Sequence, residues 1–141
     1  MKRPSSGDLE AAKRLLTHEC SDDAHPAKAA ARAYQKLHAR LAPLIGSAGY
    51  RALFFRSLKA AKRTGFTFLE GDAADPAADL GQQLGDSLHG REPGEAAEAA
   101  AVVFASFFGL LTTFIGDRLT RQVLRGAWPE MTGSLPAETE K

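Results

Sequence analysis

No charged side chain interrupts the run from Ala99 to Gly116, and this feature constrains the fold more than any other in the sequence. The run reads AAAVVFASFFGLLTTFIG. A helix that is apolar on every side must be enclosed, and a membrane span needs about 20 apolar residues, with a range of about 17–25. Glu95 and Glu98 precede the run, Asp117 and Arg118 end it, and no aromatic or basic girdle flanks both ends. We therefore expect a buried core helix and disfavour a membrane span.

The remaining composition favours further helices packed around this core helix, at about 95–115. Alanine is abundant and β-branched residues are scarce, which favours helix over strand. A chain of 141 residues is long enough for one domain with a single core. We predict an all-α, single-domain bundle of about five to six helices. The bundle is expected to span residues 6–131, between flexible tails at 1–5 and 132–141.

Turn and capping residues divide the chain into the other helices. The expected helices begin after Ser6, at about Pro26, at Ser47, after Pro76 and at Asp117. Pro43 and Gly46 should end the second helix, and Trp128-Pro129 should end the last, with the indole packed back on the bundle. Residues 66–69 are expected to form a loop whose aromatic rings cover the core. No internal repeat of fixed period is evident.

Small side chains line one side of the central helix. At about 100° per residue they fall on one face, which lets a neighbouring helix approach closely. The stripe comprises Ala105, Gly109, Thr112, Thr113 and Gly116. Two interpretations remain open: internal packing, or the seam of a homodimer, since symmetric dimers are the commonest oligomers. We expect a homodimer.

The charges of the chain are segregated, which the formal net charge of +1 conceals. Nine basic and no acidic residues lie between Lys28 and Arg63, whereas eight acids and a single base lie between Glu70 and Glu98. At helical spacing the bases form three rows, Lys28, Arg32, Lys36 and Arg40, then Arg56, Lys59 and Arg63, then Arg118, Arg121 and Arg125. These rows predict contact with an acidic protein partner; the alternatives are a solvated face or pairing with the chain's own acidic segment. Nucleic acid is disfavoured, because the domain is near neutral and contains no recognised reading motif.

Residues that could carry chemistry are few. The loop from His18 to His25 holds several potential ligands, including Glu19 and Cys20, but its spacing matches no zinc signature, so no metal and no cofactor are predicted. His25 and Lys28 have the His-x-x-Lys spacing used in helical phosphotransfer proteins, although Pro26 places the histidine at a helix start. His38 borders an apolar face and has three open interpretations: a hydrogen-bonded boundary histidine, a haem ligand or a base.

The sequence therefore predicts a small, non-catalytic regulatory or adaptor protein that acts through charged helix faces. Its single cysteine excludes an intrachain disulfide, and its first residues lack the apolar segment of a secretory signal, so we expect a cytoplasmic protein. Two alternatives remain: a sensor with an apolar ligand in its phenylalanine-rich core, and a histidine phosphotransfer protein.

Overall fold

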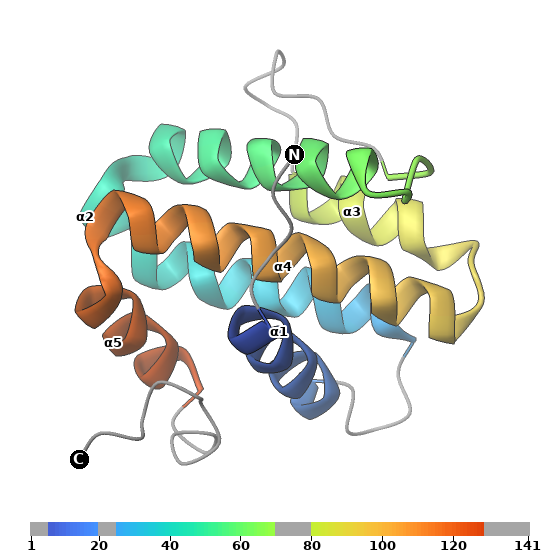
Figure 1. Ribbon diagram of the computed structural model, residues 1–141, viewed down its shortest axis with the longest axis horizontal. Helices are drawn as coiled ribbons and strands as arrows, with labels where there is room; N and C mark the ends of the chain where they lie inside the picture. Colours follow the sequence, from blue (N-terminus) through green and yellow to red (C-terminus); the bar gives the residue numbers. More distant parts are fainter. Residues whose placement is uncertain (1–5, 20–24, 70–79, 129–141) are drawn as a thin grey trace.

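The computed structural model describes residues 6–19, 25–69 and 80–128, and within them the chain is an all-α bundle (Figure 1). The helices are α1 (Ser6–Glu19), α2 (Pro26–Arg63), α3 (Leu80–His89), α4 (Pro93–Ile115) and α5 (Asp117–Ala127). The predicted fold class is thereby confirmed. The predicted tails at 1–5 and 132–141 and the start of the fourth helix after Pro76 lie outside the described residues.

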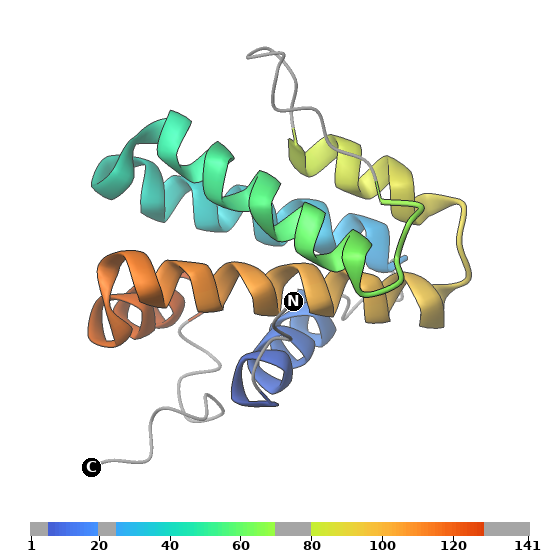
Figure 2. The same ribbon diagram turned by 45° about the horizontal axis from the view of Figure 1, so that its top comes forward.

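Two rods make up α2, as the sequence predicted. Gly46 interrupts the helix with φ 84° and ψ 153°, a backbone conformation that is essentially restricted to glycine. We call residues 26–45 the first arm and residues 47–63 the second arm. Pro43 lies in the last turn of the first arm. Proline bends or ends a helix, because it has no N–H to donate and its ring clashes with the preceding turn. The second arm turns back along the bundle, so both arms flank α4 (Figures 1 and 2).

The uncharged run forms the centre of the bundle, within α4. This helix packs against α1, α2, α3 and α5, and its buried side chains include Val103, Phe104, Phe107, Phe108 and Leu111. By length and composition α4 would qualify as a membrane span, but half of its most apolar window is buried inside the bundle. The helix therefore acts as the core of this fold, as its flanking charges predicted.

An aromatic cluster joins the two arms of α2 to α4. The Phe54 ring lies 4.8 Å from Tyr34, 5.5 Å from Phe104 and 5.7 Å from Phe107, measured between centroids. The Tyr50 hydroxyl donates a hydrogen bond of 2.8 Å to the Tyr34 carbonyl, which satisfies the polar atom inside the cluster. These rings pack against one another in the core, and their contacts hold the two arms of α2 together.

The loop after the second arm covers one edge of the core. Leu69 is fully buried, and the rings of Phe66 and Phe68 meet edge to face with centroids 6.1 Å apart. The guanidinium of Arg91 lies 4.2 Å from the centroid of the Phe68 ring. The predicted aromatic loop is confirmed, and a cation–π contact ties it to the start of α4.

The bundle contains a repeated corner that our reading of the sequence missed. Residues 41–54 and 111–124 share the pattern Leu-x-x-(Leu/Phe)-Ile-Gly-(Ser/Asp)-x-x-x-Arg-x-(Leu/Val)-(Phe/Leu). The succession of buried and exposed side chains is the same in both segments. Gly116, with φ 96° and ψ 156°, repeats the conformation of Gly46. Each segment thus forms the same helix–glycine–helix corner, one inside α2 and one between α4 and α5.

Candidate functional site

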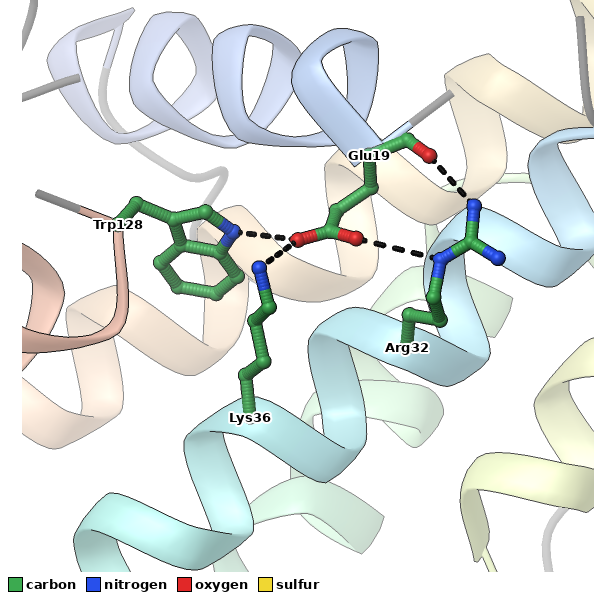
Figure 3. A network of polar contacts seen from close by, with 4 residues as sticks. All are labelled: Glu19, Arg32, Lys36 and Trp128. Carbon is green, nitrogen blue, oxygen red and sulfur yellow. Dashed lines mark hydrogen bonds and ion pairs between the residues drawn. The ribbon is translucent and has the colours of Figure 1, made fainter. Parts of the chain in front are cut away.

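A buried carboxylate, Glu19, joins three separate parts of the chain (Figure 3). Its side chain comes from the last residue of α1 and is 7% exposed. Lys36 Nζ lies 2.5 Å from Oε2, Trp128 Nε1 donates to the same oxygen at 2.7 Å, and Arg32 Nε donates to Oε1 at 3.3 Å. Arg32 also donates from Nη2 to the Glu19 backbone carbonyl at 2.7 Å. We call these four residues the Glu19 cluster.

The members of the Glu19 cluster come from α1, from α2 and from the residue that follows α5. Arg32 and Lys36 are four residues apart on the first arm of α2, so both point to the end of α1. Trp128 follows the last residue of α5, and its indole is buried, as predicted. The Lys36 ammonium also lies 5.5 Å from the centroid of the indole ring. The cluster therefore fastens α1 and the end of α5 to the same side of α2.

Electrostatics in this cluster favour the ionised carboxylate. Burial alone raises the pKa of Glu19, but it is outweighed by hydrogen bonds from Lys36 and Trp128, by the charge of Lys36 and by the hydrogen bond from Arg32. The pKa of Glu19 consequently lies below its ordinary value of 4.5. A carboxylate held ionised in this way is suited to fixing positions in the fold, because it accepts every bond offered to it.

Replacing Glu19 by glutamine should lower stability in a pH-dependent way. A depressed folded-state pKa stabilises the native chain above the unfolded-state pKa, and that contribution is lost as pH falls through the folded-state value. We expect Glu19→Gln to lower the free energy of unfolding by about 1–2 kcal/mol at about pH 7, a figure reduced because Arg32 and Lys36 are partly exposed. Urea unfolding of the parent chain and of Glu19→Gln at about pH 7 and about pH 3 measures the free energy of unfolding of each. The difference between the two chains should be smaller at the lower pH.

Glu10→Gln is the matched control for this measurement. Glu10 lies on the same helix but is exposed, and its partner Arg14 is 3.8 Å away across one turn. Such exposed pairs contribute about 0–1 kcal/mol, so this variant should unfold almost as the parent chain does. If Glu19→Gln lowered the free energy of unfolding by the same amount at both pH values, the assigned ionisation of Glu19 would be contradicted.

The structure separates the three predicted basic rows into different roles. In the first row, Arg32 and Lys36 face Glu19, a residue outside the acidic segment that was considered as an internal partner. The Arg40 side chain lies against α5, where a Cβ added at Gly126 would meet its guanidinium at 2.9 Å. Lys28 lines a surface groove between α2 and α3. The first row is therefore not a single surface.

The second predicted row remains together on the outside of the bundle. Arg56, Lys59 and Arg63 are all exposed on the second arm of α2, as is the neighbouring Lys62. Lys59 Nζ lies 5.6 Å from the centroid of the Phe55 ring beside it. Among the described residues, no carboxylate pairs with these four bases. We call them the second-arm basic row.

The three bases of the third predicted row all lie on α5. Arg121 pairs with Asp117 one turn earlier, and Arg125 is half-buried with an interaction of its own. Arg118 is exposed. Two of the three bases are thus engaged within the chain.

The predicted small-residue stripe of α4 is divided between core and surface. Ala105 is fully buried, so it belongs to internal packing and cannot form part of a surface seam. Gly109 and Thr112 are half-buried, whereas Thr113 and Gly116 are exposed. The Thr113 hydroxyl donates to the Gly109 carbonyl of its own helix at 3.1 Å. The homodimer stays a prediction.

The two candidate functional histidines, His25 and His38, both contact other residues of the bundle. His25 caps α2, since its Nδ1 accepts a hydrogen bond of 3.0 Å from the backbone N–H of Ala27. Its Nε2 lies 3.1 Å from the Arg91 carbonyl, so it is the protonated nitrogen, and its ring stacks on His89 with centroids 5.3 Å apart. Both ring nitrogens are in use, which disfavours phosphotransfer at this residue.

His38 joins the two arms of α2 across the first corner. Its Nε2 lies 3.3 Å from Ser47 Oγ, and its ring meets Tyr50 edge to face with centroids 5.2 Å apart. These contacts agree with the interpretation of a hydrogen-bonded boundary histidine. A role as haem ligand or base stays untested.

No metal site arises from the parts of the chain that the structure describes. No group of three or more potential ligand side chains gathers within these parts, while Cys20 and the acids after it lie outside them. Two surface grooves of about 330 and 350 Å³ lie between α2 and α3 and beside α1 and α4, away from the aromatic cluster. No known protein family, curated protein or solved structure shows significant similarity to this chain.

Proposed function

We propose that this protein is a non-catalytic adaptor that binds an acidic protein surface through the second-arm basic row. The supporting observation is that Arg56, Lys59, Lys62 and Arg63 are all exposed on one helix that carries no acid. By contrast, Arg32 and Lys36 of the first arm are engaged by Glu19. The second arm therefore concentrates positive charge on a rigid outer helix.

The position of the second arm supports docking rather than catalysis. Its inner face is held by the buried side chains of Leu53, Phe54, Ser57, Leu58 and Ala61, so the helix cannot rotate to hide its bases. A fixed row of like charges raises the rate of encounter with an acidic partner and orients it. Because guanidinium groups form paired hydrogen bonds with carboxylates, the two arginines favour an acidic protein over a diffuse counter-ion cloud.

Reversing three charges of the row should weaken binding to an acidic probe. We expect Arg56→Glu, Lys59→Glu and Arg63→Glu together to raise the Kd for a fluorescent polyglutamate peptide by about tenfold or more, because attraction becomes repulsion. Fluorescence anisotropy at several salt concentrations measures the effect, and binding to the parent chain should weaken as salt screens it. Lys13→Glu and Arg14→Glu on α1 form the control, with exposed bases on a different face.

A photo-crosslinking amino acid tests the same row with the natural partner. Placed at exposed Ala52, one turn before Arg56, it should give an adduct that the triple reversal removes. At exposed Ala97, near the start of α4, it should give no such adduct. Equal peptide binding by the parent and the triple variant, with unchanged adducts, would rule out this role for the row.

A further inference from the structure

The two repeated corners bring two apolar side chains to the same end of the bundle. Leu44 and Phe114 occupy equivalent positions, two residues before Gly46 and Gly116. Both corners lie at the left end of the bundle in both views, where α2 turns back and α4 passes into α5 (Figures 1 and 2). We call Leu44, Ile45, Phe114 and Ile115 the apolar tip.

The apolar tip is open to solvent. Leu44 is 52% exposed and Phe114 is 63% exposed, which makes them the large apolar side chains left uncovered within the described residues. Ile45 and Ile115 beside them pack partly against the core. A Cβ built at either corner glycine would meet no atom within 4 Å, so open space lies beside the backbone there. Both corner glycines are exposed as well, so the tip is a solvent-facing part of the bundle.

Bases outnumber acids in the sequence around the two corners. Within eight residues of either corner glycine the sequence has Arg40, Arg51, Arg118 and Arg121, against a single acid, Asp117. The other described acids lie outside the two corners, on α1, on α3 and in the first turns of α4, for example Glu10, Asp86 and Glu95. The tip thus combines exposed apolar side chains with a local excess of bases over acids.

A second copy of the chain is a poor occupant for this tip. Two tips brought together would oppose arginines of like charge, which disfavours association. Stable interfaces bury roughly 800 Å² on each partner, far more than two protruding side chains expose. An exposed apolar point with an excess of bases near it is instead suited to the boundary of a lipid bilayer, where acyl chains receive the apolar side chains and anionic headgroups receive a guanidinium group such as that of Arg118.

We propose that the apolar tip docks this protein on an anionic membrane surface. Leu44 and Phe114 enter the acyl boundary, while the exposed Arg118 next to the second corner contacts phosphate and carboxylate headgroups. The helices stay outside the bilayer, because α4 keeps its apolar faces in the bundle core. This surface is separate from the second-arm basic row, so an adaptor with both would hold an acidic protein at a membrane.

Tryptophan probes on the full-length chain test this proposal. Leu44→Trp or Phe114→Trp should be quenched by brominated lipids in vesicles of phosphatidylcholine with about 30% phosphatidylserine. Ala97→Trp at the opposite end should not be quenched, and native Trp128 is buried in the parent chain. Vesicle sedimentation should show binding about tenfold or more tighter than to phosphatidylcholine alone. Leu44→Ser with Phe114→Ser should weaken it by about tenfold, with an unchanged circular dichroism spectrum.

Each other outcome decides against the tip. Vesicle binding without quenching at residues 44 and 114 would show that another surface, such as the second-arm basic row, touches the lipid. The triple reversal of Arg56, Lys59 and Arg63 separates these cases, because it should leave the quenching intact. A light-scattering mass of two chains that falls to one chain in the double serine variant would make the tip a self-association surface and overturn the proposal.

Discussion

Truncation of Phe54 to alanine is expected to lower the free energy of unfolding by about 3–5 kcal/mol, the usual cost of removing a buried phenylalanine ring. The Phe54 side chain is fully buried and contacts the rings of Tyr34, Tyr50, Phe104 and Phe107. These rings belong to both arms of α2 and to α4, so the deleted ring leaves a cavity where the three rods meet. The total free energy of unfolding of a small domain is about 5–15 kcal/mol, so the variant should be close to unfolding at 37 °C.

Urea denaturation followed by circular dichroism measures this loss. Phe114→Ala is the matched control, because the same ring is removed from a side chain that is 63% exposed. Exposed positions of this kind change stability by about 0.5 kcal/mol or less. A similar loss for the two variants would contradict the aromatic cluster as the centre of the core.

Two glycines on α3 should respond to alanine in opposite directions. A Cβ added at Gly81 would lie 2.5 Å from Tyr34 Cδ1, well inside contact distance. The Tyr34 ring is buried and packs on Tyr50 and Phe54, so it cannot move aside without disturbing the cluster. We expect Gly81→Ala to cost about 1–3 kcal/mol through overpacking, even though alanine is the better helix former.

Gly85→Ala, one turn later, is the control and should stabilise the chain. The added Cβ would meet the Ala27 carbonyl oxygen at 3.5 Å and the Ala31 Cβ at 3.9 Å, which are ordinary contacts. Alanine then gains about 0.8–1 kcal/mol over glycine in a helix interior, less near a helix end. Thermal unfolding of the two variants side by side gives the signs directly. Stabilisation by both would show that α3 does not approach the first arm of α2 at Gly81.

The architecture was predictable because local rules govern it. An uncharged run longer than a buried strand, with charges close at both ends, specifies a core helix, and α4 confirms it. Proline and glycine punctuation located the break in α2 at Gly46 and the start of α2 at Pro26. The burial of Trp128 also followed from its place after the last helix. Each of these depends on neighbours within a few residues.

The candidate sites were less predictable because they combine distant residues. Glu19 and Trp128 are separated by most of the chain, and nothing in the spacing of either one points to the other. Helical spacing predicted Arg32 and Lys36 on an exposed basic face of their helix. This spacing indicates which residues share one side of a helix, but it does not indicate what packs against that side. The repeated corner did have a sequence signal, the recurrence of Leu-x-x-(Leu/Phe)-Ile-Gly. It was overlooked because a single recurrence has no regular period.

The sequence by itself determined the helical class, the central position of α4 and the corner at Gly46, because hydrophobic pattern and backbone preference act locally. The tertiary structure alone decided which charges remain available. Packing of α1 and Trp128 against α2 turned two of the predicted surface bases into partners of a buried carboxylate, because an ionised Glu19 inside the bundle must be neutralised by whatever cation lies within reach. The same packing left the second-arm basic row exposed and brought Leu44 and Phe114 to one end of the molecule.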